Sequence, residues 1–284
     1  MTAAGTAAPG LRAATAAQPS EGASTARRTD PIVVLTYACA GADVMRSLLA
    51  GSPELACTSG TGLLPLCEQT ALTWQRAEGQ HGPPSALALK SIRALAGSMI
   101  SLLLAREGKR RWCEFATARP SYAQTFLRAY PGTRFVCLHR NCADVIRLAL
   151  RANPWGLAGR EFGAFAAAYA GYSAAAVAAY WVEHTRPMLE FEESHPGACR
   201  RVRYEDLAAV PGSLPSEMLT FLDLDHVSVV TPSLTHGPDT SGDNAGAEFA
   251  DAAGGIPVDQ LSPPLLSEVD DLMARLSYPP LDQA

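Results

Sequence analysis

A continuous apolar strand, Ile32–Tyr37, which runs into a turn of small residues and then a helix, most constrains how this chain can fold. The strand shows no alternation of apolar and polar residues, as expected for a parallel strand covered on both faces. Helical segments separate it from further strands, which predicts an α/β fold, a three-layer sandwich with a central parallel sheet flanked by helices. We expect strands at 54–57, 111–116, 134–139 and 199–203, and helices at 43–50, 63–78, 86–106, 143–151, 161–194 with a break near 171, and 214–224. Two more helices are expected, one that begins at 121 and closes before 131, and one that begins at 258 or 263 and ends at 276.

The length and composition of the chain favour one domain. Of 284 residues, 48% are hydrophobic, enough for one substantial core. We expect a single domain over residues 31–284 and a disordered tail over residues 1–30, which are rich in Ala, Thr, Gly and Ser. The net charge of −5 excludes a general basic field for nucleic acid or for an anionic membrane surface. No run is expected to reach the roughly 18–20 apolar residues that span a bilayer.

The cysteines argue against a disulfide framework and against a metal site. There are seven, an odd number, with no C-x-x-C pair and no Cys/His cluster at zinc spacing. Most lie in apolar runs, which predicts reduced, buried thiols in a cytoplasmic protein. Nothing in the sequence decides between a monomer and a homodimer.

The turn after the first strand has the outline of an anion site. Backbone N–H groups of Ala40, Gly41 and Ala42 are expected at a helix N-terminus, where unpaired donors and the helix dipole favour an anion. The turn lacks the Lys and hydroxyl of the nucleoside triphosphatase motif G-x-x-x-x-G-K-[ST]. A plain connection between strand and helix is the alternative interpretation.

Arg140 directly follows the apolar strand RFVCLH, so it is expected at the same sheet edge as the turn. A guanidinium there can hold an anion with two hydrogen bonds. The alternative is an ion pair with a helix acid. Arg147 and Arg151, four residues apart on the next helix, either add to this clamp or form a solvated face.

Two segments resemble the sulfotransferases that use 3′-phosphoadenosine-5′-phosphosulfate (PAPS). PGTRFVCLHRNCADVIRLAL is similar to the family's fPdarfv.lvRdprDv segment, and VRYEDLAAVPGSLPSEMLTFLDL to its RYEdLvadPe...l..FLgl segment. RSLLAGSPEL and the closing GGIPVDQLSPPLLSEVDDLMARLSYPPL align as well, so the resemblance covers most of residues 31–284. It implies the sulfotransferase fold, which is like that of the P-loop nucleotide-binding proteins.

The resemblance also implies a set of cofactor-binding positions. The first turn of the family holds the 5′-phosphosulfate of PAPS, an Arg and a Ser of the second motif hold the 3′-phosphate, and a late G-R-G adds a basic contact. The corresponding positions in this chain are Ala38, Cys39, Ala40, Gly41, Ala42 and Asp43 for the turn, Arg140 and Leu148 for the second motif, and Ala253, Gly254 and Gly255 for the last.

Several of these positions depart from the family. Cys39 replaces a basic residue, Asp43 a hydroxyl, and Gly254 an arginine, while Leu148 replaces a serine and cannot hydrogen-bond a phosphate. A carboxylate at Asp43 stabilises a helix start but repels a phosphosulfate. Charge-assisted hydrogen bonds contribute about 1.5–3 kcal/mol each, so these losses weaken the cofactor site unless backbone donors and Arg147 compensate.

Family members use a His or a Glu as the base that accepts the proton of the acceptor. Glu68, shortly after the polar turn T-S-G-T-G, is the first candidate, followed by Glu114 and His139 at strand ends. The alternatives are structural: a solvated helix acid, an ion-pair partner of an arginine, and a hydrogen-bonded histidine beside Arg140. We expect His184 on a helix surface.

The leading hypothesis is a sulfotransferase that moves a sulfuryl group from PAPS to a hydroxyl of a small molecule, for instance a secondary metabolite in natural product biosynthesis. Two alternatives follow from the altered turn: a non-catalytic binding protein, or an acid–base enzyme that acts on an anionic substrate with Glu68 or His139 and Arg140. We expect the acceptor pocket to be lined by residues 60–66, the loop in the 80s, and residues 153–159 including Trp155.

Overall fold

The computed structural model of this chain describes residues 29–154, 156–157, 161–210, 214–224 and 256–283. Residues 1–28 of the predicted tail and residues 225–255 lie outside this range.

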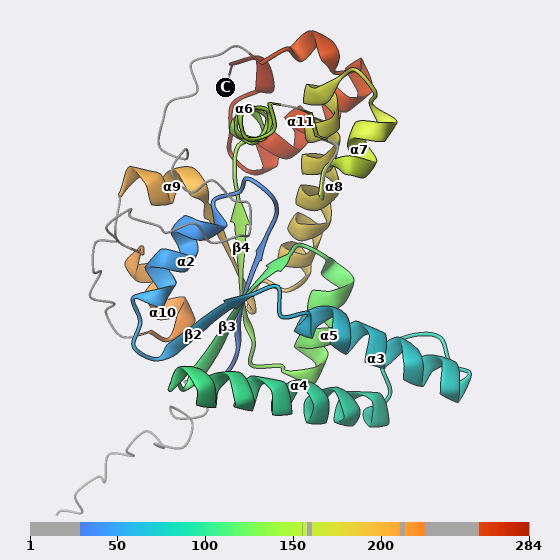
Figure 1. Cartoon of the computed structure of the whole chain (residues 1–284), viewed down its shortest axis with the longest axis vertical. Coiled ribbons are helices and arrows are strands. Elements are labelled where there is room, and N and C mark those ends of the chain that lie inside the picture. The colour runs from blue at the N-terminus through green and yellow to red at the C-terminus, as the bar shows by residue number, and fades with distance from the viewer. Residues whose placement is uncertain (1–28, 155, 158–160, 211–213, 225–255, 284) are drawn as a thin grey trace, which may run out of the picture.

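Five parallel strands form a single sheet in the order β2-β3-β1-β4-β5 (Figure 1). The first strand is central, as its continuous apolar sequence predicts: Val33 pairs with Glu114 on one side and with Phe135 on the other. Because all strands are parallel, their carboxyl ends meet at one edge. The strands are β1 (Ile32–Thr36), β2 (Leu55–Ser59), β3 (Arg111–Thr117), β4 (Arg134–His139) and β5 (Cys199–Arg203).

Helices cover both faces of the sheet, so the predicted three-layer α/β sandwich is confirmed (Figure 1). Val34 and Phe115 lie in one buried cluster, and Val33 and Trp112 in another on the opposite face. The first cluster is covered by α2 (Ala42–Ala50), α9 (Tyr204–Ala209) and α10 (Ser216–Leu222). The second includes residues of α3 (Leu63–Glu78), α4 (Ala86–Glu107), α5 (Pro120–Ala129), α6 (Cys142–Ala152), α8 (Ser173–Ser194) and α11 (Pro263–Arg275).

The helix boundaries follow local sequence signals. Ser85 begins α4 by accepting a hydrogen bond from the N–H of Ala88, and Gly108 ends that helix in the left-handed conformation. The region expected to break near Gly171 forms α7 (Gly163–Ala168) and α8. Short 3₁₀ helices, η2 (Val258–Gln260) and η3 (Leu281–Gln283), flank α11. Helix α9, of six residues, has no counterpart among the predicted helices.

Helix α4 has a largely exposed apolar surface. Leu87, Leu95, Met99 and Leu102 are between 38% and 72% exposed. Within the described ranges, α4 is long and apolar enough to cross a membrane by length and composition, and 17% of its apolar window is buried. The expectation that no segment reaches this length and hydropathy is therefore wrong for α4, although length and composition alone do not make a membrane span.

The cysteines are all free thiols, five of them buried and two, Cys39 and Cys57, partly exposed. The structure brings no three His, Cys, Asp or Glu side chains of the described residues together as metal ligands would be.

Candidate active site

The turn between β1 and α2 presents unpaired backbone donors. Gly41 has φ 89°, in the left-handed region, and its carbonyl accepts the first helical bond of α2, from the N–H of Met45 at 3.3 Å. The N–H groups of Gly41 and Ala42 have no acceptor among the residues that the structure describes. Asp43 lies in the first turn of α2, with an oxygen 3.5 Å from Arg46. The expected N-terminal donors are thus present.

Tyr204 fills the space that a side chain at position 41 would occupy. A carbon added at Gly41 would lie 2.1 Å from Cδ2 of Tyr204, so glycine is required both by φ and by packing. The guanidinium carbon of Arg140 lies 4.0 Å from the centre of the same ring. Nη1 of Arg140 also donates to the carbonyl of Cys39 at 3.1 Å. The arginine of the second motif therefore lies directly beside the turn.

The backbone of Arg140 is fixed by neighbouring aromatic residues. Its N–H donates to the hydroxyl of Tyr37 at 3.0 Å, and its carbonyl accepts from Nε1 of Trp181 at 2.9 Å. The Arg140 residue is 6% exposed. The position of this guanidinium is therefore set by the fold before any ligand binds.

The remaining predicted cofactor positions contribute less. Nη1 of Arg147 donates to Asp144 on the same helix at 3.0 Å, and the Arg147 side chain is 21% exposed. Leu148 is partly buried on α6. Gly254 and Gly255 lie outside the described residues.

Glu114 holds a loop in place. It is 2% exposed and accepts hydrogen bonds from Oγ1 of Thr58 at 2.5 Å, and from N and Oγ1 of Thr61 at 3.0 and 2.9 Å. Burial raises the pKa of Glu114, and the threonine hydrogen bonds act in the opposite direction. Its carboxylate joins β2 and β3 to the loop before α3, which is a structural role.

Glu68 and His139 are also committed to structural contacts. Oε2 of Glu68 accepts from Oγ1 of Thr125 at 2.5 Å and so links α3 to α5. His139 is fully buried, with Nε2 2.5 Å from Glu192, whose other oxygen accepts from Nε of Arg201 at 2.7 Å. Burial lowers the pKa of His139, although Glu192 opposes this shift. None of the three predicted bases lines the cavity beside the turn.

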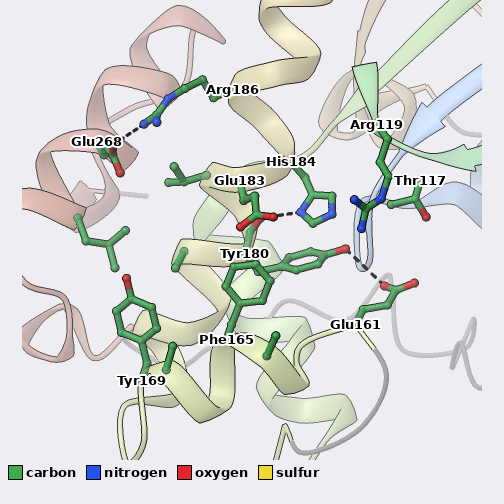
Figure 2. A pocket seen from close by; sticks show the side chains of 15 residues that line it. Thr117, Arg119, Glu161, Phe165, Tyr169, Tyr180, Glu183, His184, Arg186 and Glu268 are labelled. Carbon is green, nitrogen blue, oxygen red and sulfur yellow. Dashed lines mark hydrogen bonds and ion pairs between the residues drawn. The ribbon is translucent and has the colours of Figure 1, made fainter. Parts of the chain in front are cut away.

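A cavity of about 820 Å³ lies between the end of β3 and helices α7, α8 and α11 (Figure 2). It adjoins the turn through Tyr180, whose hydroxyl accepts from the N–H of Ala38 at 2.9 Å and lies 3.4 Å from Oε2 of Glu161. Burial raises the pKa of Tyr180. The residues predicted to line the acceptor pocket, 60–66 and the loop in the 80s, do not line this cavity, and Trp155 lies outside the described residues.

His184 lines the cavity and is 8% exposed, so the expectation of a helix-surface residue is wrong. Its Nδ1 lies 2.9 Å from the carbonyl of Tyr180, one helical turn earlier, and its ring centre lies 4.2 Å from that of Tyr180. Figure 2 shows the other ring nitrogen directed toward Arg119. Burial lowers the pKa of His184, and Arg119 acts in the same direction.

Arg119 brings a positive charge to the same part of the cavity. It follows the end of β3, where Ala118 donates to the carbonyl of Thr36 at 2.8 Å, so it lies beside the turn after β1. In the described part of the chain its guanidinium has no ion pair or hydrogen bond, and it lies 6.0 Å from the ring of Tyr122. Sequence reasoning assigned no role to Arg119, which lies three residues past the predicted strand at 111–116. It suggested a surface position for His184, because that residue lies in an unbroken helical pattern.

Comparisons with known proteins agree with this architecture. The profile of the sulfotransferase family matches residues 31–228. A Caenorhabditis briggsae protein, named provisionally as a protein-tyrosine sulfotransferase, is 25% identical over 194 residues, which cover 66% of this chain and 62% of that protein. This chain thus spans less than two thirds of that relative.

Two solved structures share the fold. The sulfotransferase domain of the Synechococcus PCC 7002 olefin synthase has a TM-score of 0.51 and 15% identity, over 88% of this chain and 96% of that one. The Mycobacterium avium sulfotransferase STF9 has a TM-score of 0.50 and 13% identity, over 87% and 76%. With the family profile covering more than half of its residues, this chain belongs to the sulfotransferase family.

Proposed function

We propose that this protein transfers a sulfuryl group from PAPS to a hydroxyl of a small molecule. The observation that carries the proposal is the position of Arg140, stacked on Tyr204 and hydrogen-bonded to the carbonyl of Cys39 beside the unpaired N–H groups of Gly41 and Ala42. A guanidinium beside a helix N-terminus offers neighbouring binding positions for phosphate groups.

The residues of the site fit an anionic cofactor with fewer charged contacts than the family pattern implies. Arg140 would hold its 3′-phosphate, and the N–H groups of the turn its 5′-phosphosulfate. When bound, PAPS supplies the sulfuryl group and leaves as 3′-phosphoadenosine-5′-phosphate (PAP). The charge of Asp43 is partly offset by Arg46 at 3.5 Å, and Arg119 brings a cation to the sheet edge where Cys39 has replaced one.

The cavity supports a small acceptor with an aromatic or other apolar body. Its volume of about 820 Å³ falls in the range of small-molecule sites. Phe165, Tyr169 and Tyr180 line it with ring surfaces (Figure 2). A phenolic hydroxyl fits such walls, and the name of the Caenorhabditis briggsae relative makes a tyrosine side chain a second candidate acceptor. We place the reaction in the cytoplasm, because every cysteine is a free thiol.

A non-catalytic binding protein on the same fold is the rival function, and Asp43 is the observation that favours it. The carboxylate lies in the first turn of α2, where the sulfuryl donor of the family would place negative charge. An anion other than a phosphosulfate, or a neutral metabolite, would then occupy the cavity.

The test is calorimetric titration with PAP, which needs no knowledge of the acceptor. Replacing Arg140 with Ala removes charge-assisted hydrogen bonds of about 1.5–3 kcal/mol each, so affinity should fall about 10- to 150-fold per bond lost. The matched control is Arg134→Ala, at the opposite end of β4, where the guanidinium contacts Phe221 and the carbonyl of Gly197. This variant should bind PAP as the wild type does.

Two results would refute the proposal. One is an absence of binding by the wild-type protein at about millimolar PAP, which would assign the fold a role without this cofactor. The other is unchanged affinity in Arg140→Ala, which would remove Arg140 from the phosphate site.

A further inference from the structure

We propose that His184 is the base that accepts the proton of the acceptor hydroxyl, and that Arg119 is the cation beside it in the wall of the same cavity. This inference rests on the proposed sulfuryl transfer and adds the identity of the group that moves the proton. It replaces Glu68, Glu114 and His139, whose hydrogen bonds commit them elsewhere.

The hydrogen bond at Nδ1 determines which nitrogen of His184 is basic. A backbone carbonyl can only accept, so the 2.9 Å contact with the carbonyl of Tyr180 requires the proton on Nδ1. Nε2 then carries the lone pair. In the part of the chain that the structure describes, Nε2 has no hydrogen-bond partner, and the side chain lines the cavity. A ring nitrogen with a free lone pair in the wall of a cavity is suited to remove a proton there.

Burial is the main influence that keeps the imidazole of His184 neutral near pH 7. Arg119 from the end of β3 and burial both disfavour the protonated ring, whereas Glu183 on its own helix and Glu161 before α7 favour it. Tyr37 from β1 contributes a neutral ring 6.5 Å away. The net effect is a lowered pKa for His184, so most of the enzyme carries the basic form at neutral pH.

The location of His184 connects the base to the donor turn. Tyr180, which supplies the carbonyl to Nδ1, also accepts from the N–H of Ala38 in that turn. The base therefore lies in the wall of a cavity that adjoins the donor turn. The acceptor oxygen forms a bond to sulfur, the bond from sulfur to the leaving phosphate oxygen breaks with its electron pair, and the hydroxyl proton moves to Nε2 of His184.

Two substitutions of His184 separate catalysis from packing. Asn can keep the hydrogen bond to the carbonyl of Tyr180 but has no group at the position of Nε2, whereas Gln reaches that position without a basic nitrogen. PAP titration verifies that each variant keeps the donor site. The rate is measured with radiolabelled PAPS and 4-methylphenol, whose hydroxyl, like that of tyrosine, has a pKa of about 10 and so carries its proton at pH 7. A reaction without the phenol measures the transfer of the sulfuryl group to water.

For both His184 variants, we expect kcat to fall about 100- to 10,000-fold, with PAP affinity unchanged. Arg119→Ala should shift the acidic limb of the pH–rate profile to higher pH, toward the ordinary histidine pKa of about 6.5. Arg119→Lys should return the limb to its wild-type position. Arg186→Ala is the control, since Arg186 lies in the same cavity but pairs with Glu268 at 2.5 Å, and it should leave the limb in place.

The outcomes distinguish this inference from the proposed function. If wild-type protein binds PAP and His184→Asn turns over at the wild-type rate, His184 is not the base, although the protein remains a sulfotransferase. If no PAP binds, the proposed function fails and this inference fails with it. In protein that binds PAP, nuclear magnetic resonance of ¹⁵N-labelled histidine gives a second readout. A neutral ring protonated at Nδ1 near pH 7 supports the inference, whereas a proton on Nε2 or a charged ring overturns it.

Discussion

Replacing Gly41 with Ala should destabilise the protein for two reasons, backbone strain and a clash with Tyr204, and the structure gives a magnitude for each. At φ 89° an alanine adopts the left-handed region, which costs about 1–2 kcal/mol. The added carbon would lie 2.1 Å from Tyr204, whose ring is held by Arg140 and is 4% exposed, and such overpacking costs about 1–3 kcal/mol. We expect a total of about 2–5 kcal/mol, or a fall in Tm of about 4–20 °C.

Urea unfolding followed by circular dichroism measures the total, and two variants separate its parts. Gly60→Ala is the control for backbone strain, since Gly60 has φ 65° and nothing within 4 Å of the added carbon, so about 1–2 kcal/mol is expected. In a Tyr204→Ala background, Gly41→Ala should lower the free energy of unfolding by no more than about 1–2 kcal/mol, the cost of backbone strain alone. If Gly41→Ala costs the same with and without the Tyr204 ring, the ring does not close the turn and the reasoning fails.

Three further predictions concern the acids and the histidine that the sequence suggested as bases. Glu68→Gln should change stability by about 0.5–1.5 kcal/mol through its bond to Thr125 and leave the transfer rate unaltered; a tenfold slower rate would restore Glu68 as the base. Glu114→Ala should lower the free energy of unfolding in urea by about 1–3 kcal/mol, because the hydroxyls of Thr58 and Thr61 lose this acceptor. Burial lowers the pKa of His139 in the folded protein, so as the pH falls this histidine is protonated in the unfolded chain before it is protonated in the folded one. The free energy of unfolding should therefore fall as the pH drops below about 6.5. Unfolding curves from about pH 7 to pH 5 should show a smaller fall for His139→Gln, and an equal fall would exclude this residue as a cause.

The sheet could be predicted because its strands carry local signals. The apolar runs at Ile32–Thr36 and Arg134–His139 leave no polar face for solvent, and the small residues of the turn after β1 give a helix start. Helix α9 was missed because Tyr204–Ala209 is only six residues long, with no apolar repeat to mark it. The position of Arg140 at the turn followed from the parallel topology alone.

The cavity could not be predicted from the sequence, because its wall depends on how α7, α8 and α11 pack against one another and against the end of β3. His184 and Glu190 belong to the same helix, yet the first is 8% exposed and lines the cavity, whereas the second is exposed. Only the packing of α8 on the sheet and on α11 sets this difference. The same holds for Glu68 and Glu114, whose threonine partners come from segments distant in sequence.

For the proposed sulfuryl transfer, the two contacts of Tyr180 predict the order in which the substrates bind. Its hydroxyl caps the N–H of Ala38, and its carbonyl orients His184, so a donor that takes over this N–H must first release the tyrosine hydroxyl. The freed side chain can then turn toward the cavity and change its wall. Steady-state kinetics should show a compulsory sequence in which PAPS enters before the acceptor and PAP departs last, with PAP competing against PAPS alone. The dead-end complex of PAP and acceptor would then accumulate, and excess acceptor would inhibit the enzyme.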